Sequence, residues 1–234
     1  MSKKKEVSSA DLVKIEPITD NQKLLFEGYK QGKNGFYFGC AGTGKTFVSL
    51  YLAMQDVLDL KTKYDKVILV RSLIPTREIG FLPGDEEDKA ALYQVPYQNM
   101  VKFMFEQPNE QAFNMLYDRL KNQGSLYFLS TSFLRGLTFD NSIIIVDECQ
   151  NLNFHELDTI TTRVGQDSKI IFCGDFSQTD LIKQNEKNGL HDFLRILMEM
   201  QEFNCVEFNI GDIVRSGFVR NYLIQKTKLG MGME

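Results

Sequence analysis

Cysteine, histidine and long apolar runs are scarce in this chain of 234 residues. Its four cysteines stand far apart, at positions 40, 149, 173 and 205, which argues against both a disulfide framework and a zinc knuckle. The two histidines, His155 and His191, are too isolated to form a metal site. No apolar run approaches the roughly 20 residues of a membrane helix, and the N-terminus lacks an apolar signal core. We therefore expect a cytoplasmic protein with reduced thiols and no membrane partner.

A basic excess is also missing, since the formal net charge is −4. This balance argues against a generally basic nucleic-acid binder, although it leaves room for a local basic groove. The length suits one large domain better than two. Residues 1–16 show little pattern and predict a flexible N-terminal arm, so that residues 17–234 form the domain itself.

Short apolar strands alternate with helical patterns along the chain. Strands are predicted at residues 36–38, 66–70, 126–129, 142–146, 169–173 and 205–208. Helices are predicted from 19 or 20 to about 32, and at 45–60, 94–122 with a break near Pro108, 154–164, 189–200 and 217–227, while 71–93 has the character of a loop. The alternation predicts an α/β fold with a mostly parallel sheet, helices on both faces, and ligands at the carboxyl ends of the strands.

A glycine-rich loop follows the first strand, and residues 39–46 fit the pattern G-x-x-x-x-G-K-[S/T]. Its glycines allow backbone N–H groups to curl around phosphate oxygens, and the next helix adds the positive end of its dipole. Lys45 is expected to reach the β- and γ-phosphates of a nucleotide, and the Thr46 hydroxyl to bind Mg²⁺. The loop residues expected to bind the nucleotide are Gly39, Ala41, Gly42, Thr43, Gly44, Lys45 and Thr46.

Carboxylates end a second strand, because Asp147 and Glu148 follow the run at residues 142–146. Asp147 is the expected Mg²⁺ partner beside the loop, and Glu148 the expected general base that activates water. The alternative for Glu148 is a carboxylate that faces solvent. Gln178 follows another strand and is a candidate γ-phosphate sensor, with a surface glutamine as the alternative.

Further short motifs stand in order at residues 71–72, 80–85, 135–138, 147–151, 162–165, 174–181, 189–190 and 212–215. Together with the phosphate-binding loop they resemble the PhoH family of ATPases, whose core is similar to the first motor domain of superfamily 1 helicases. The resemblance extends from about residue 19 to 225. The sequence departs from the family pattern at Ser72, Leu137 and Cys149, where the family usually has proline, arginine and alanine.

The resemblance implies a single RecA-like P-loop NTPase domain that uses ATP and Mg²⁺. It also implies that Gln22 reads the adenine edge, with a surface glutamine as the alternative. Hydrolysis calls for an arginine near the γ-phosphate, and we expect an identical subunit to supply it in trans, in a homo-oligomer that is a hexameric ring by resemblance. Arg215, Arg163 and Arg135 are the candidates, each with an ordinary surface arginine as the alternative.

The work done by such an ATPase is open to two interpretations. The first is remodelling of single-stranded RNA or DNA with helicase-like activity, gripped by the loop at residues 72–88, whose charge is mixed. The second is an ATP-dependent switch or assembly protein that acts on a protein partner without translocation, which the sequence pI near 5.4 favours. A nucleotide kinase is a third class, but the Asp147–Glu148 pair fits water activation better.

Overall fold

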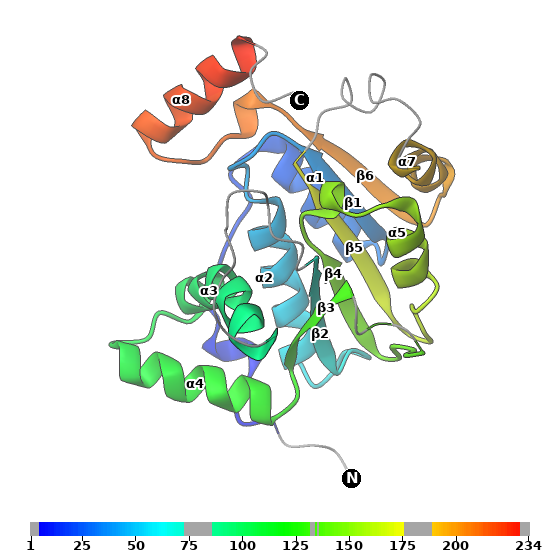
Figure 1. Ribbon diagram of the computed structural model, residues 1–234. Coiled ribbons are helices and arrows are strands. Elements are labelled where there is room, and N and C mark those ends of the chain that lie inside the picture. The colour runs from blue at the N-terminus through cyan, green and yellow to red at the C-terminus, as the bar shows by residue number, and fades with distance from the viewer. Residues whose placement is uncertain (1–4, 73–85, 132–133, 135, 176–188, 230–234) are drawn as a thin grey trace.

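The computed structural model describes residues 5–72, 86–131, 134, 136–175 and 189–229, and this part of the chain builds a six-stranded sheet (Figure 1). The strands are β1 (Asn34–Gly39), β2 (Lys66–Arg71), β3 (Leu126–Ser130), β4 (Ser142–Val146), β5 (Lys169–Gly174) and β6 (Phe203–Phe208). Their order is β3-β2-β4-β5-β1-β6, and every neighbouring pair is parallel. The predicted parallel sheet is therefore confirmed, and all the strands end at the same edge.

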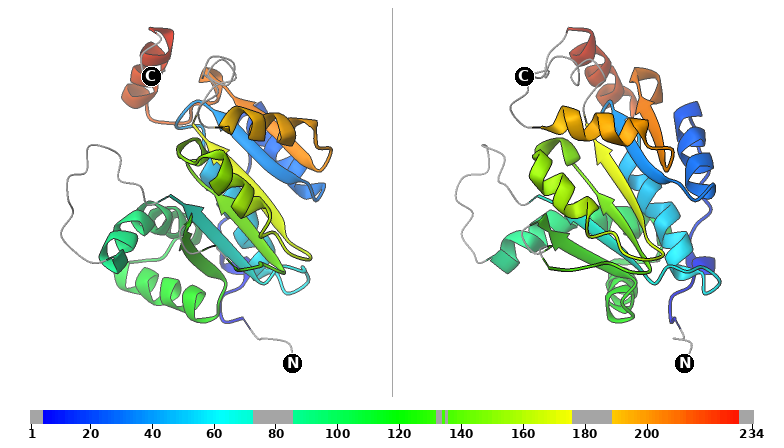
Figure 2. Two further views of the ribbon diagram at one scale, coloured as in Figure 1. Left: turned by 45° about the vertical axis from the view of Figure 1, so that its right-hand side comes forward. Right: turned by 90° about the vertical axis from the view of Figure 1, so that its right-hand side faces the viewer.

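Helices cover both faces of this sheet (Figure 2). The described helices that cover the sheet are α1 (Asp20–Lys30), α2 (Lys45–Leu58), α3 (Glu86–Phe105), α4 (Glu110–Asn122), α5 (Phe154–Thr161) and α7 (Leu190–Glu199), and α8 (Gly217–Lys228) stands apart from it. Helices α1 to α4 share one apolar core with the sheet, and α5 and α7 share another on the opposite face. None of the described helices is both long and apolar enough to cross a membrane.

Consecutive strand residues divide between the two cores because side chains alternate along a strand. In β1, Tyr37 packs with α1 and α2, whereas Phe36 and Phe38 belong to the core under α5 and α7. Both kinds of residue are buried, as expected for strands covered on both sides. This arrangement explains why β4 is apolar from Ile143 to Val146 instead of alternating apolar and polar residues.

The region between β2 and β3 departs from the sequence-based expectation. Helix α3 begins at Glu86, inside a stretch predicted as loop, and continues through Pro96. The predicted break near Pro108 is confirmed, since α4 begins at Glu110 behind Asn109, whose side chain accepts a hydrogen bond from the Ala112 N–H. Helix α3 brings Tyr97, from the part that was predicted to be helical, to Asp147 at the end of β4.

Residues 5–16, expected to belong to a flexible arm, are packed onto the body of the protein. Val7 is 3% exposed and lies in the core beside α2 and α4. The Val13 N–H donates to the Met104 carbonyl, and the Ile15 N–H donates to the Tyr51 hydroxyl. Although the segment has no regular sequence pattern, burial of its apolar side chains stabilises its packing on the body of the protein.

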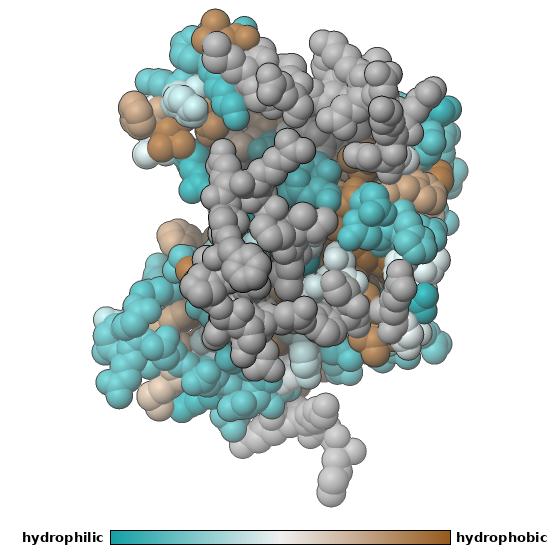
Figure 3. All heavy atoms as spheres, in the orientation of Figure 1, coloured by the Kyte–Doolittle hydropathy of each residue, from teal (hydrophilic) through white to brown (hydrophobic). Residues whose placement is uncertain are grey.

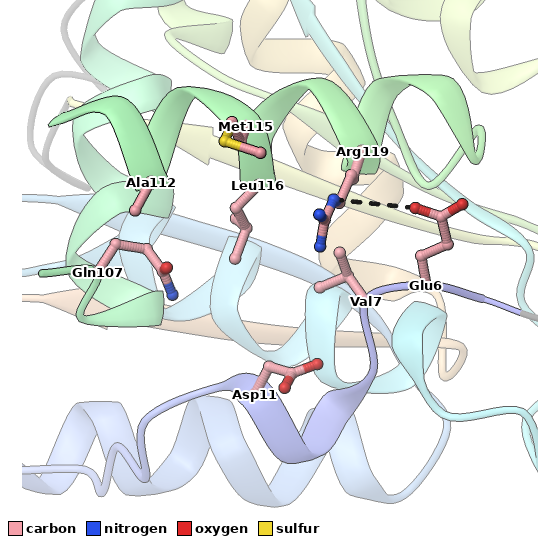
Figure 4. A pocket seen from close by; sticks show the side chains of 8 residues that line it. All are labelled: Glu6, Val7, Asp11, Gln107, Ala112, Met115, Leu116 and Arg119. Carbon is pink, nitrogen blue, oxygen red and sulfur yellow. Dashed lines mark ion pairs between the residues drawn. The ribbon is translucent and has the colours of Figure 1, made fainter. Parts of the chain in front are cut away.

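A pocket of about 310 Å³ lies between this N-terminal segment and α4 (Figure 4). Val7 and Leu116 supply apolar walls, and Glu6 pairs with Arg119 at one end. None of the residues that line it belongs to the glycine-rich loop or to the carboxylates after β4. The candidate site is therefore elsewhere, at the carboxyl ends of the strands.

Candidate nucleotide-binding site

The glycine-rich loop connects β1 to α2 and is held by backbone bonds from two neighbouring segments. The Cys40 N–H donates to the Phe208 carbonyl at the end of β6, and the Val214 N–H donates to the Gly42 carbonyl. Gly39 adopts φ 110° and Gly44, the N-cap of α2, adopts φ 85°, a region that residues with a Cβ rarely occupy. The loop is thus a rigid turn that ends at a helix N-terminus, as phosphate binding requires.

Lys45 lies inside this loop, although lysine is rarely buried. Its Nζ donates to the carbonyls of Gly39 at 3.0 Å and Cys40 at 2.7 Å, and the residue is 7% exposed. Burial lowers the pKa of the Lys45 ammonium, while the nearby charge of Asp175 opposes that shift. A cation kept within a ring of backbone groups is placed to meet phosphate oxygens.

The structure brings Thr46 and Asp147 together across 101 positions of sequence. The Thr46 hydroxyl donates to Asp147 Oδ1 at 2.7 Å. Asp147 is largely buried, and its own N–H donates to the Val70 carbonyl of β2, which fixes the backbone after β4. A hydroxyl and a carboxylate oxygen at this spacing form a hard-ligand pair of the kind that Mg²⁺ prefers.

Glu148 is half-buried and has left-handed backbone angles, φ 53° and ψ 42°. Burial raises the pKa of its carboxyl, and the neighbouring Asp147 charge raises it further. The Gln150 amide donates to Glu148 Oε2 at 2.6 Å and accepts from the Asp175 N–H at 3.0 Å. Gln150 therefore orients Glu148 and ties the ends of β4 and β5 together, a role that the sequence interpretation did not assign to it.

Gln22 is buried rather than on the surface. It follows Thr19, whose side chain caps α1 by accepting the Gln22 N–H. The Gln22 amide nitrogen donates to the Thr43 carbonyl at 3.0 Å, and its oxygen accepts from the Ile18 N–H at 2.9 Å. The side chain thus joins α1 to the glycine-rich loop, next to the residues expected to hold the nucleotide.

Two of the candidate arginines, Arg215 and Arg163, lie at opposite edges of the sheet. Arg215 is exposed beside the loop of its own chain, where a Cβ added to Gly42 would lie 2.8 Å from Arg215 Cγ. Arg163 follows α5, and its carbonyl accepts from the Phe139 N–H ahead of β4, at the amino edge. Arg135 and Gln178 lie outside the described residues.

Two residues near Asp147 were not predicted as part of the site. Tyr97 of α3 donates its hydroxyl to Asp147 Oδ2 at 2.7 Å and is 2% exposed. Burial raises the pKa of Tyr97, and the adjacent Asp147 charge raises it further, so the hydroxyl keeps its proton. Arg71, at the end of β2, lies over the Tyr93 ring at 5.8 Å and close enough to influence both Tyr97 and Glu148 electrostatically. In the sequence, the one indication of this part of the site was the family-like pair Arg71–Ser72.

Comparison with known proteins agrees with this architecture. The chain is 34% identical over 207 residues to a PhoH-like protein of Synechocystis sp., covering 88% of this chain and 60% of that protein. It is 32% identical over 190 residues to protein PhoH of Escherichia coli, covering 80% of this chain and 51% of that protein. The chain therefore spans 60% or less of the length of these two relatives.

A solved structure of similar fold is the large terminase from the thermophilic bacteriophage D6E in complex with ADP. It matches with a TM-score of 0.53 at 13% identity, covering 90% of this chain and 50% of that one. This likeness shows the fold, which is that of a RecA-like P-loop ATPase domain. The family profile described as PhoH-like protein matches residues 14–225, nearly the whole chain. The chain belongs to the PhoH family.

Proposed function

We propose that this protein binds ATP together with Mg²⁺ and hydrolyses it. The observation that carries the proposal is the 2.7 Å contact between Thr46 Oγ1 and Asp147 Oδ1, next to the buried ammonium of Lys45. Mg²⁺ bound at this oxygen pair together with ATP would neutralise charge on the β- and γ-phosphates. Lys45 and the backbone N–H groups of the loop would hold those phosphates in line for attack.

Glu148 is the general base in this proposal. It accepts a proton from water as the water oxygen bonds to the γ-phosphorus, and the bond from phosphorus to the bridging oxygen breaks to release ADP. The raised pKa of Glu148 moves this carboxylate toward the basicity that favours proton transfer near neutral pH. Gln150 steadies the carboxylate through the 2.6 Å bond to Oε2.

A matched pair of substitutions at Thr46 tests the nucleotide site. Thr46→Ser keeps the hydroxyl, whereas Thr46→Val replaces it with a methyl group of similar size. We expect Mg²⁺-dependent ATP hydrolysis to survive in the serine variant and to fall by at least about a hundredfold in the valine variant. Equal activity in the two variants would contradict the role given to the hydroxyl.

We propose that single-stranded RNA or another nucleic acid is the partner of this ATPase. Residues 213–229 carry Arg215, Arg220, Lys226 and Lys228 but no acidic residue, although the whole chain has a net charge of −4. Most of them lie on α8, which stands apart from the sheet and packs against the turn at Ile210–Asp212 (Figures 1 and 3). Phe218 is 84% exposed on the same helix, and an exposed ring beside cations suits stacking on a base.

Binding of a fluorescent single-stranded RNA measures this directly. The double variant Arg220→Gln with Lys226→Gln should weaken binding and reduce the slope of log K against log salt by about 1.4, or 0.7 for each phosphate that is no longer neutralised. Lys61→Gln, an exposed charge outside α8, is the control. RNA that neither binds nor stimulates hydrolysis would favour the second candidate, an ATP-dependent switch that acts on a protein, for which the exposed apolar side chains of α8 are the supporting observation.

We also propose a homo-oligomer in which an arginine acts in trans. Arg163 lies at the amino edge of its own sheet, away from its own loop, so it could reach only the nucleotide of a neighbouring subunit. Mixing inactive Lys45→Ala with inactive Arg163→Ala should restore activity, because some mixed interfaces then contain both intact residues. A mixture that stays inactive would exclude Arg163 in trans and leave Arg215, beside its own loop, and Arg135 as the candidates.

A further inference from the structure

Both oxygens of the Asp147 carboxylate are held by hydroxyl groups from different helices. Thr46 at the start of α2 donates to Oδ1 at 2.7 Å, and Tyr97 in the middle of α3 donates to Oδ2 at the same distance. The first contact belongs to the expected nucleotide site. The second comes from a helix that carries none of the nucleotide-binding residues identified above.

Tyr97 is placed rigidly enough to control the carboxylate. Its ring is buried among α3 and sheet residues, with the Phe128 ring centroid 5.8 Å away. Val101 and Met104, further along α3, are fully buried in the same core. The tyrosine hydroxyl is thus anchored by packing along one face of α3, and this packing fixes the direction from which it donates to Oδ2.

We propose that Tyr97 is a positioning residue for the metal site: its hydroxyl holds Asp147 Oδ2 so that Oδ1 stays directed at Thr46 and at the Mg²⁺ that accompanies ATP. This inference rests on the proposed ATPase function. When the Thr46 oxygen becomes a metal ligand, its donor bond to Oδ1 is given up, and the Tyr97 hydroxyl still restrains the carboxylate at Oδ2. Outer partners of this kind tune metal affinity without touching the metal.

The same contact links α3 to the site. Asp147 Oδ2 is bonded to Tyr97, which is part of the α3 packing surface. Arg71 strengthens the connection, since it contacts the Tyr93 ring one turn earlier in α3 and lies near Glu148. Helix α3 is therefore connected to Asp147 through Tyr97 and to the surroundings of Glu148 through Arg71.

Tyr97→Phe tests the proposal because it removes only the hydroxyl. We expect the Mg²⁺ concentration for half-maximal ATP hydrolysis to rise about tenfold or more, as for other outer partners of metal ligands. Binding of a fluorescent ATP analogue in EDTA should stay unchanged, while the Mg²⁺-dependent gain in its affinity should shrink. Tyr117→Phe, which removes a hydroxyl from the same core, should leave both Mg²⁺ dependences unaltered.

A fall in stability alone is separated from this effect by Leu25→Ala, which leaves a cavity under α1 in the same core but keeps the Tyr97 hydroxyl and the packing around it. The proposal is overturned if Tyr97→Phe has the wild-type Mg²⁺ dependence, whatever its turnover, or if Leu25→Ala shifts that dependence equally. Failure of the ATPase proposal has a different signature, because a wild-type protein that does not hydrolyse ATP still reports Mg²⁺ dependence in the binding assay.

Discussion

Gly39→Ala should damage both the fold and the nucleotide loop. Gly39 has φ 110°, and an added Cβ would lie 2.0 Å from the Phe208 carbonyl oxygen, a backbone atom of β6 that cannot swing aside. That oxygen accepts the hydrogen bond of the Cys40 N–H, so relief of the overlap must separate the loop from β6. Positive φ alone costs about 1–2 kcal/mol for a residue with a Cβ, and the overlap should bring the loss to about 3 kcal/mol or more.

Gly32→Ala provides the matched control, because Gly32 has φ 81° but nothing lies within 4 Å of its added Cβ. Denaturant unfolding should show a loss of about 1 kcal/mol for Gly32→Ala and at least twice that for Gly39→Ala. ATP analogue binding should weaken only in Gly39→Ala, since Lys45 bonds the Gly39 carbonyl. Equal destabilisation of the two variants would refute the argument that close approach to β6, and not backbone angle, demands glycine at this position.

Two further predictions concern buried polar side chains. Lys169 is buried against the Tyr29 ring, and burial lowers its pKa from 10.5 to about 8. The unfolded chain therefore binds more protons between those values, so stability should rise by about 2 kcal/mol from pH 7.5 to 9.5 relative to Lys169→Met, as denaturant unfolding at both pH values would show. Gln22→Ala leaves the Thr43 carbonyl and the Ile18 N–H without this partner. Because Gln22 is the residue expected to read the adenine edge, the Gln22→Ala variant should also lower the ratio of kcat/KM for ATP to kcat/KM for GTP at least tenfold. An unchanged ratio would exclude an adenine contact.

Most of the sheet could be predicted because its strands are short, largely apolar and separated by helices. The predicted strand at residues 142–146 matches β4, and the others differ only at their ends. Strand ends depend on neighbours, which a local pattern does not contain: β6 begins at Phe203, two residues before the predicted start, where Asn34 of β1 pairs with it. The packing of residues 5–16 was missed for the same reason, since Val7 and Ile15 owe their burial to α2 and α4.

The residues of the site also differ in whether a local motif or a distant contact determines their position. Thr46 and Asp147 could be predicted to meet because each follows its own local motif at the carboxyl end of a strand. Tyr97 could not, because the sequence predicted a helix at residues 94–122 but did not show which of its side chains would face the end of β4. That contact depends on how α3 packs against the sheet. Arg215 likewise follows a family-like motif, yet its place beside the loop of its own chain comes from the turn after β6.

The most direct test of the ATPase account is turnover of Glu148→Gln measured beside ATP binding by the same preparation. The substitution keeps the shape of the side chain and its neighbour Gln150, but it removes the group that takes the proton. The account predicts a loss of about a hundredfold or more in kcat with ATP and Mg²⁺ still bound. A variant that hydrolyses ATP at the wild-type rate, or a wild type that binds ATP and never hydrolyses it, would contradict the account.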